Sequence, residues 1–154
     1  MQRPVLLVTL LVMAPPSVLA QQLERSPAAD GAAVYFITPA GGEQVPGEFT
    51  VRFGLRSMGV APAGHQALNT GHHHLLVDLD ELVALDQPLP KTEQVLHFGA
   101  GQTEVKLSLA PGAHTLQLVL GDHLHIPHVP PLVSEKIMVV VGPQGDGVED
   151  ASDG

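Results

Sequence analysis

Apolar residues occupy every second position in several short runs across the middle of the chain. The clearest run has them at Phe49, Val51, Phe53 and Leu55, and the same spacing recurs within residues 105–109 and 116–120. A period of two places apolar side chains on one face of a β-strand, whereas an amphipathic helix needs a period of about 3.6 residues. No segment keeps a helical period for three turns. The pattern therefore predicts an all-β chain.

Turn-forming residues separate these runs. Gly and Pro gather in residues 39–42, 46–47, 99–101 and 111–112, and β-branched runs lie at 33–37 and 133–141. Short strands at regular spacing, divided by such turns, are typical of antiparallel sandwiches. We therefore predict a small antiparallel immunoglobulin-like β-sandwich of about seven strands, with a hairpin at residues 111–113.

The first 20 residues have the three parts of a secretory signal peptide. Arg3 gives a positive start, residues 5–14 are mostly apolar, and Ser17-Val18-Leu19-Ala20 offers a cleavage site after Ala20. The apolar run is too short to span a bilayer as a helix, which needs about 20 residues. We expect residues 1–20 to be removed and the mature chain to be periplasmic or secreted, without membrane insertion. An uncleaved N-terminal anchor is the alternative.

The remaining chain divides into three parts by composition. Residues 21–31 predict a flexible lead-in, and residues 32–141 the β-sandwich domain. Residues 142–154 hold four acidic residues, no basic residue and one apolar side chain larger than alanine. Such a segment cannot bury enough apolar surface to order itself. We therefore expect a disordered acidic tail.

Composition excludes several kinds of site and partner. The chain has no cysteine, so it has no disulfide and no thiolate metal site. Without the signal it carries six basic and 16 acidic residues, a formal charge of −10. That balance argues against nucleic acid and anionic membranes, which select for basic surfaces. With one Tyr and no Trp, the chain also lacks aromatic platforms for stacking on sugars or bases.

A run of three histidines precedes one predicted strand. If Leu75 and Val77 face the core, alternation puts His73 on the core face and both His72 and His74 on the opposite face. Two residues on one face of a strand are roughly 6.6 Å apart along it. Two imidazoles at that spacing can converge on one zinc or copper ion. Asp78 is a candidate partner that would orient a ligating ring.

A second histidine group follows the last predicted strand of the hairpin. His123, His125 and His128 lie in a proline-rich segment, which we interpret as a loop at one end of the sandwich. Proline lowers the entropy lost when such a loop is ordered around an ion. His97, before a glycine turn, is a further candidate, and Met58 would favour copper(I) if it lay nearby.

These groups lead to one main hypothesis, a metal-binding module for carriage, buffering or sensing of a copper or zinc ion. Its candidate ligands are His72, His74, His123, His125 and His128. The first alternative is an interaction module that presents the 57–71 and 121–131 loops to a protein or envelope component, with histidines that only hold loops together. A metalloenzyme with an open copper position is the second alternative. The sequence contains no hydrolase, metalloprotease or phosphate-binding motif that favours an enzyme.

The same residues resemble a known family. The chain is similar, from about Ala33 to Val141, to the bacterial family catalogued as domain of unknown function 4399. The segments that carry the resemblance include Val34-Tyr35-Phe36-Ile37, Asn69-Thr70-Gly71-His72-His73-His74, Leu96-His97-Phe98-Gly99 and His125-Ile126-Pro127-His128. The resemblance implies an exported, periplasmic protein of bacterial origin. It implies no activity, substrate or cofactor, so the metal hypothesis depends on the histidines themselves.

Overall fold

The computed structural model describes residues 24–143. The expected signal peptide, residues 1–20, lies outside the described residues, as does all but the start of the expected acidic tail. Nine β-strands and no helix are present in residues 24–143. They are β1 (Ala33–Thr38), β2 (Gln44–Val45), β3 (Glu48–Arg56), β4 (Gly59–Val60), β5 (Thr70–Val77), β6 (Val95–His97), β7 (Glu104–Ser108), β8 (Gly112–Gly121) and β9 (Ile137–Val141).

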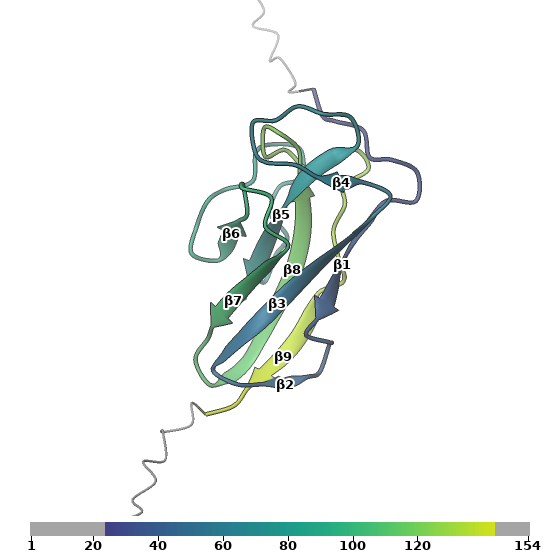
Figure 1. Ribbon diagram of the computed structural model, residues 1–154. Helices are drawn as coiled ribbons and strands as arrows, with labels where there is room; N and C mark the ends of the chain where they lie inside the picture. The colour runs from purple at the N-terminus through teal and green to yellow at the C-terminus, as the bar shows by residue number, and fades with distance from the viewer. Residues whose placement is uncertain (1–23, 144–154) are drawn as a thin grey trace, which may run out of the picture.

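The strands form two sheets that pack face to face (Figure 1). The smaller sheet has the order β1-β3-β7, and the larger has the order β2-β9-β8-β5-β4, with β6 also paired to β5. Pairing is antiparallel except between β2 and β9 and between β4 and β5. The prediction of an all-β sandwich is confirmed, with nine strands where about seven were expected. The predicted hairpin at residues 111–113 is wrong, because β7 and β8 lie in different sheets and residues 111–113 link the two sheets. No helix among the described residues has the length and apolarity needed to cross a membrane.

The space between the sheets holds the main core. Alternation in β3 sends Phe49, Val51 and Phe53 inward, where each is less than 9 % exposed, and sends Arg52 outward. Leu116, Leu118 and Leu120 of β8 face them from the larger sheet. Burial of one such side chain stabilises the fold by roughly 1.5–3 kcal/mol relative to exposure. The period-two pattern of the sequence is thus the pattern of this core.

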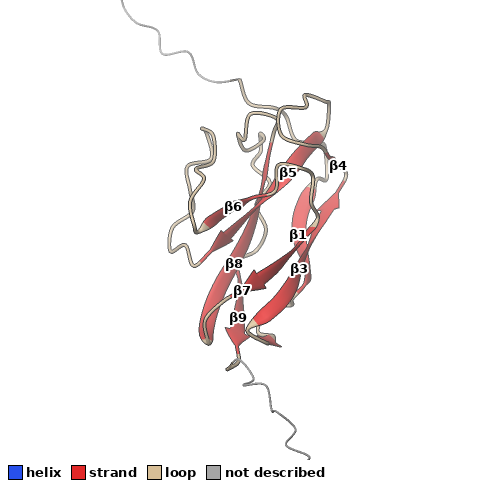
Figure 2. Cartoon of the chain, turned by 60° about the vertical axis from the view of Figure 1, so that its left-hand side comes forward, coloured by secondary structure: helices blue, strands red, loops and turns tan. Residues whose placement is uncertain are grey.

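A second, smaller core lies on the outer face of the larger sheet. The segment between β5 and β6, residues 78–94, folds back so that its Leu89 packs with Leu76 of β5, Val95 of β6 and Val119 of β8. Figure 2 shows this segment as the loop that leads into β6. Because β5 is covered on both faces, every residue from its second position onward is buried. Side chains on its outer face are therefore enclosed between the sheet and this segment.

The connection between β8 and β9 is tied to the start of the described chain. The guanidinium group of Arg25 donates to the carbonyl oxygens of Pro127 at 3.1 Å and His128 at 2.8 Å. Pro27 forms a parallel bridge with Val129. The described residues of the expected flexible lead-in are therefore held against this connection, because buried backbone carbonyls at this end need donors.

Candidate metal centre

Strand β5 separates its three histidines between two faces, as the alternation predicts. His73 points into the space between the sheets, where its ring centroid lies 5.2 Å from that of Phe53. His72 and His74 point to the outer face, and their ring centroids are 4.8 Å apart. All three are at most 1 % exposed. The outer face of β5 therefore presents two adjacent buried imidazoles.

Strand β6 adds a third ring to this face. His97 is the direct antiparallel partner of His74 in the β5–β6 pair. Residues directly opposite each other in neighbouring strands project to the same side of the sheet. The ring centroid of His97 is accordingly 5.1 Å from that of His74 and 5.0 Å from that of His72.

A fourth ring comes from the connection after β8. The ring centroid of His125 is 4.7 Å from that of His97, 5.0 Å from that of His72 and 6.1 Å from that of His74. His72, His74, His97 and His125 therefore form one group, called the histidine cluster below. Two strands and one loop, separated by up to 53 positions in the sequence, supply it.

A tight turn aims His125 at the other rings. His125 has a φ of 67°, in the left-handed region that side chains other than glycine adopt rarely. The carboxylate of Asp122 holds this turn by accepting hydrogen bonds from the backbone N–H of Leu124 at 2.9 Å and of Ile126 at 3.0 Å. The backbone N–H of Asp122 in turn donates to the carbonyl of Ile126 at 2.9 Å. The direction of His125 is thus fixed by Asp122.

Hydrogen bonds also keep Asp122 ionised. Burial alone would raise its pKa, but hydrogen bonds from the Ser26 hydroxyl at 2.8 Å and from the backbone of Ile126 and Leu124 hold the pKa below its usual value. A carboxylate that accepts several hydrogen bonds is stabilised in its charged form. The start of the described chain therefore supports the turn that carries His125.

Two glycines leave room for the rings. A Cβ atom added at Gly99 would overlap the ring of His97, and one at Gly121 would lie 2.8 Å from Cε1 of His74. Gly121 is the β8 residue opposite His72, so any side chain there would enter the cluster. The rings occupy space that these two positions leave empty.

The nitrogen atoms of the cluster can serve one ion. Ligand atoms of His72, His74 and His97 all lie within 4.8 Å of one another. Both ring nitrogens of His72, Nδ1 of His74 and Nε2 of His97 are buried with no hydrogen-bond partner within residues 24–143. An unsatisfied buried polar atom costs about 1–3 kcal/mol. This triad could hold a metal ion, which would satisfy one nitrogen of each ring.

The environment keeps the rings neutral. Burial, followed by the charges of neighbouring histidines, lowers the pKa of His72 to about 4 and that of His74 to about 3. Burial also lowers the pKa of His97, and positive charge on His125 and Lys91 acts in the same direction. Neutral imidazole is the form that ligates metals. The triad is therefore ready to ligate at neutral pH.

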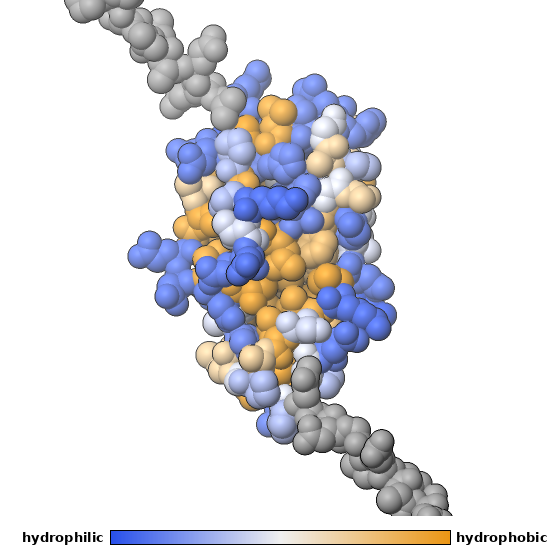
Figure 3. All heavy atoms as spheres, turned by 90° about the vertical axis from the view of Figure 1, so that its left-hand side faces the viewer, coloured by the Kyte–Doolittle hydropathy of each residue, from blue (hydrophilic) through white to orange (hydrophobic). Residues whose placement is uncertain are grey.

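The cluster meets the surface at a pocket of about 220 Å³. His74, His97 and His125 line it together with Pro88, Leu89, Pro90 and Lys91. Figure 3 looks onto the side of the molecule on which β6 lies and shows apolar atoms along its middle, surrounded by polar side chains. An ion could reach the cluster through this pocket.

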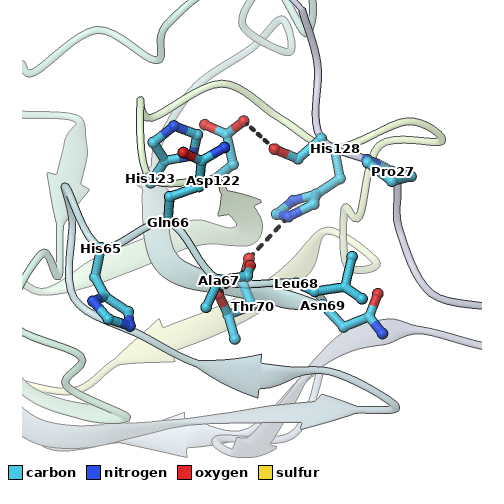
Figure 4. A pocket seen from close by; sticks show the side chains of 11 residues that line it. Pro27, His65, Gln66, Ala67, Leu68, Asn69, Thr70, Asp122, His123 and His128 are labelled. Atoms are coloured by element: carbon cyan, nitrogen blue, oxygen red, sulfur yellow. Dashed lines mark hydrogen bonds between the residues drawn. The ribbon is translucent and has the colours of Figure 1, made fainter.

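The other two predicted ligands lie elsewhere. His128 is buried, and its Nε2 lies 3.1 Å from the carbonyl oxygen of Thr70. His123 lines a different pocket, of about 300 Å³, which also contains His65. Figure 4 shows the rings of His65 and His123 apart from each other, with His128 turned toward Thr70. The structure thus brings together His72, His74 and His125 of the predicted set, adds His97, and leaves His123 and His128 outside.

Two further candidates have other contacts. Met58 packs against the main core. The Asp78 carboxylate bonds to Nδ1 of His114 at 2.7 Å and accepts from the backbone N–H of Thr115 at 2.9 Å. Asp78 has a φ of 53°, so the chain turns at the end of β5 and alternation no longer sets the direction of its side chain. Asp78 therefore does not orient a cluster histidine, contrary to the expectation from spacing.

Comparison with known proteins gives a family. No curated protein matches the chain. The solution structure of the PKD domain from human KIAA0319 is similar with a TM-score of 0.36 and 13 % identity, covering 93 % of this chain and 100 % of that one. The sequence model described as domain of unknown function (DUF4399) matches residues 51–142, which is more than half of the chain and contains the whole histidine cluster. The chain therefore belongs to the DUF4399 family, as the resemblance of its motifs predicts.

Proposed function

We propose that the domain is an exported metal-binding module that takes one copper or zinc ion at the histidine cluster, for carriage, buffering or sensing. The observation that carries this proposal is the convergence of the rings of His72, His74 and His97, whose ligand atoms lie within 4.8 Å of one another. Each of these rings has at least one buried nitrogen with no partner in the described chain. Residues 1–20, with the features of a secretory signal, support a periplasmic or secreted location. N-terminal sequencing of the mature protein should then find Gln21 first.

A bound ion resolves the energetic conflict at the cluster. Most buried polar atoms in native proteins have a partner, and exceptions concentrate at ion and redox sites. Zinc–nitrogen bonds of about 2.0–2.1 Å place two tetrahedral ligands about 3.4 Å apart. The triad atoms all lie within 4.8 Å of one another, so they are already near that separation without an ion. The fold therefore preorganises most of the site.

The ligand chemistry narrows the choice of ion. The cluster offers only imidazole nitrogen, and imidazole suits zinc, copper, iron and nickel. Calcium and magnesium prefer oxygen ligands, which the described cluster does not supply. The absence of cysteine from the sequence removes thiolate, the other common zinc ligand.

Elemental analysis tests the proposal directly. The chain from residue 21 onward, produced without a histidine tag, is dialysed against copper, zinc or neither, and bound metal per chain is then measured. We expect close to one ion per chain. The variant His72→Ala/His74→Ala should retain none, because it removes two of the three triad ligands.

A matched control uses a histidine outside the cluster. His65 is exposed and lies in the other pocket, so His65→Ala should keep the full stoichiometry. Metal retained equally by the double variant, or several loosely held ions that respond to neither change, would contradict the proposal. The interaction module with structural histidines would then be the better hypothesis.

A further inference from the structure

The cluster has a closed side and an open side. His72 is fully buried and does not line the pocket, whereas His74, His97 and His125 do. An ion held by the cluster therefore has protein on one side and the pocket on the other. Metal sites that bind exogenous ligands differ from structural sites by such a vacant direction.

Rigid apolar residues form the far wall of the pocket. Pro88 and Pro90 have a fixed φ, and Leu89 between them is 7 % exposed because it packs into the second core. The backbone N–H of Leu89 donates to the carbonyl oxygen of His125 at 2.9 Å. The wall is thus attached to the loop that carries a cluster ring. At about 220 Å³, the pocket admits only a small ligand.

The charge at the pocket is positive, although the chain has a net charge of −9. Lys91 lines the pocket, and its described lining contains no acidic residue. Lys91 is exposed at the pocket beside His97, and its positive charge lowers the pKa of that ring. A bound divalent ion would add further positive charge in a partly dehydrated site, which favours an anion.

We propose that the metal ion in the cluster keeps one coordination position open to this pocket and binds a small anion there, with Lys91 providing the opposite charge. This inference rests on the proposed metal-binding function. The pocket volume of about 220 Å³ admits a small anion such as hydroxide, azide, formate or bicarbonate. The site is therefore suited to exchange of small ligands rather than to full enclosure of the ion.

Azide is a suitable probe, because its complex with copper(II) has a charge-transfer band in the near-ultraviolet and visible range. The chain from residue 21 onward is loaded with copper, its metal content is measured, and sodium azide is added at constant ionic strength. We expect a saturable band with one azide per copper and a matching change in the electron paramagnetic resonance spectrum. Lys91→Ala should weaken azide binding at least about fivefold without lowering copper content.

The control removes an equal charge elsewhere. Lys106 is exposed on β7 of the smaller sheet, where its ammonium group lies 3.5 Å from Glu48. Lys106→Ala should leave azide binding unchanged. Copper retained at one ion per chain with no saturable azide band would overturn this inference and leave the proposed function standing, as would azide affinities equal in Lys91→Ala and the unaltered chain. Failure to retain copper would overturn both.

Discussion

The histidine cluster and His128 are neighbours, and both consist of buried imidazole rings. They differ in whether the ring nitrogens have hydrogen-bond partners. Nε2 and Nδ1 of His128 lie 3.1 Å and 3.5 Å from the carbonyl oxygens of Thr70 and Leu120, on the two strands that it joins. Nδ1 and Nε2 of His72, two residues after Thr70, have no partner within residues 24–143. His72 and His128 are thus equally buried, but only the nitrogens of His128 have carbonyl partners. The presence or absence of hydrogen-bond partners, and not the degree of burial, therefore distinguishes a structural histidine from a candidate metal ligand.

The pair of the half-buried His114 and the exposed Asp78 resembles His128 in this comparison. Nδ1 of His114 lies 2.7 Å from the carboxylate of Asp78, and Nε2 lies 2.8 Å from the carbonyl oxygen of Ala110. Both ring nitrogens thus have partners. This ring links the end of β5 to the start of β8, a structural task that leaves no nitrogen for an ion.

His73 is a buried histidine that belongs neither to the cluster nor to the hydrogen-bonded rings. It is buried like its neighbours on β5, and burial lowers its pKa to about 4. Its ring packs against Phe53 in the main core, away from the cluster. A single ring cannot form a metal site, so a nitrogen without a partner suggests an ion only where several such atoms converge.

The largest expected effect comes from removing His128. In metal-free protein, His128→Ala should lower the free energy of unfolding by about 2–4 kcal/mol, because it removes the hydrogen bond between the buried ring and a strand carbonyl and leaves a cavity. His72→Leu should leave that free energy unchanged or raise it, since it replaces two nitrogens without partners by apolar atoms of similar volume. Urea denaturation in the presence of a chelator measures both.

For metal content we expect the opposite ranking of the two variants, with the larger loss in His72→Leu. His128→Ala should still retain about one ion per chain under conditions where it remains folded, and His72→Leu should retain none. Equal losses of stability in the two metal-free variants would break the comparison, because they would show that His72 also has a structural partner.

The pH dependence of stability is the next largest effect. The folded-state pKa values of His72 and His74 are lowered from 6.5 to about 4 and about 3. Below pH 6.5 the unfolded chain binds protons that the folded chain does not, so stability falls as the pH falls toward 4. Between pH 7 and pH 5 we expect metal-free protein to lose about 1–2 kcal/mol.

Variants separate the cluster from other titrating groups. His72→Leu/His74→Leu should show a flatter stability profile between pH 6.5 and pH 4. His114 has the opposite sign, because its hydrogen bond to Asp78 raises its pKa, so its contribution is complete below pH 6.5 and is lost at higher pH. The pKa of Asp122 is lowered, so its contribution to stability is lost only near and below the usual value of 3.8. An unchanged acid profile in the double variant would assign the loss to His73 and His97, whose pKa values burial also lowers.

The positions of the histidines within strand β5 could be predicted from the sequence. Alternation in β5 is enough to place His72 and His74 together and His73 apart, because β-strand geometry is regular over such a short distance. The sandwich fold follows from the same alternation in β3 and β8. Local periodicity thus determined both the fold class and the first two members of the cluster.

The remaining members depend on long-range pairing and on a turn. His97 joins the cluster only because β6 pairs with β5 in a register that sets it opposite His74, across the intervening residues 78–94. His123 and His125 would share a face if extended, but the left-handed backbone at His125 sends the two rings to different pockets. Asp122 is the residue in the sequence that could have indicated this turn. An aspartate carboxylate can accept backbone N–H groups a few residues later, and here it accepts those of Leu124 and Ile126.

The smallest expected effect concerns the room that Gly121 leaves for the rings. It tests whether metal binding depends on this room as well as on the ligands themselves. A methyl group added by Gly121→Ala would lie 2.8 Å from Cε1 of His74 and 3.3 Å from Cα of His125, so a ring must move. We expect copper or zinc to bind about fivefold more weakly, a change of about 1 kcal/mol. In the control Gly59→Ala the nearest atom is Cγ2 of Thr70 at 3.5 Å, an ordinary contact, and affinity should not change. Isothermal titration calorimetry compares the two; equal affinities would mean that the rings can adjust and that the empty space at Gly121 has no part in holding the ion.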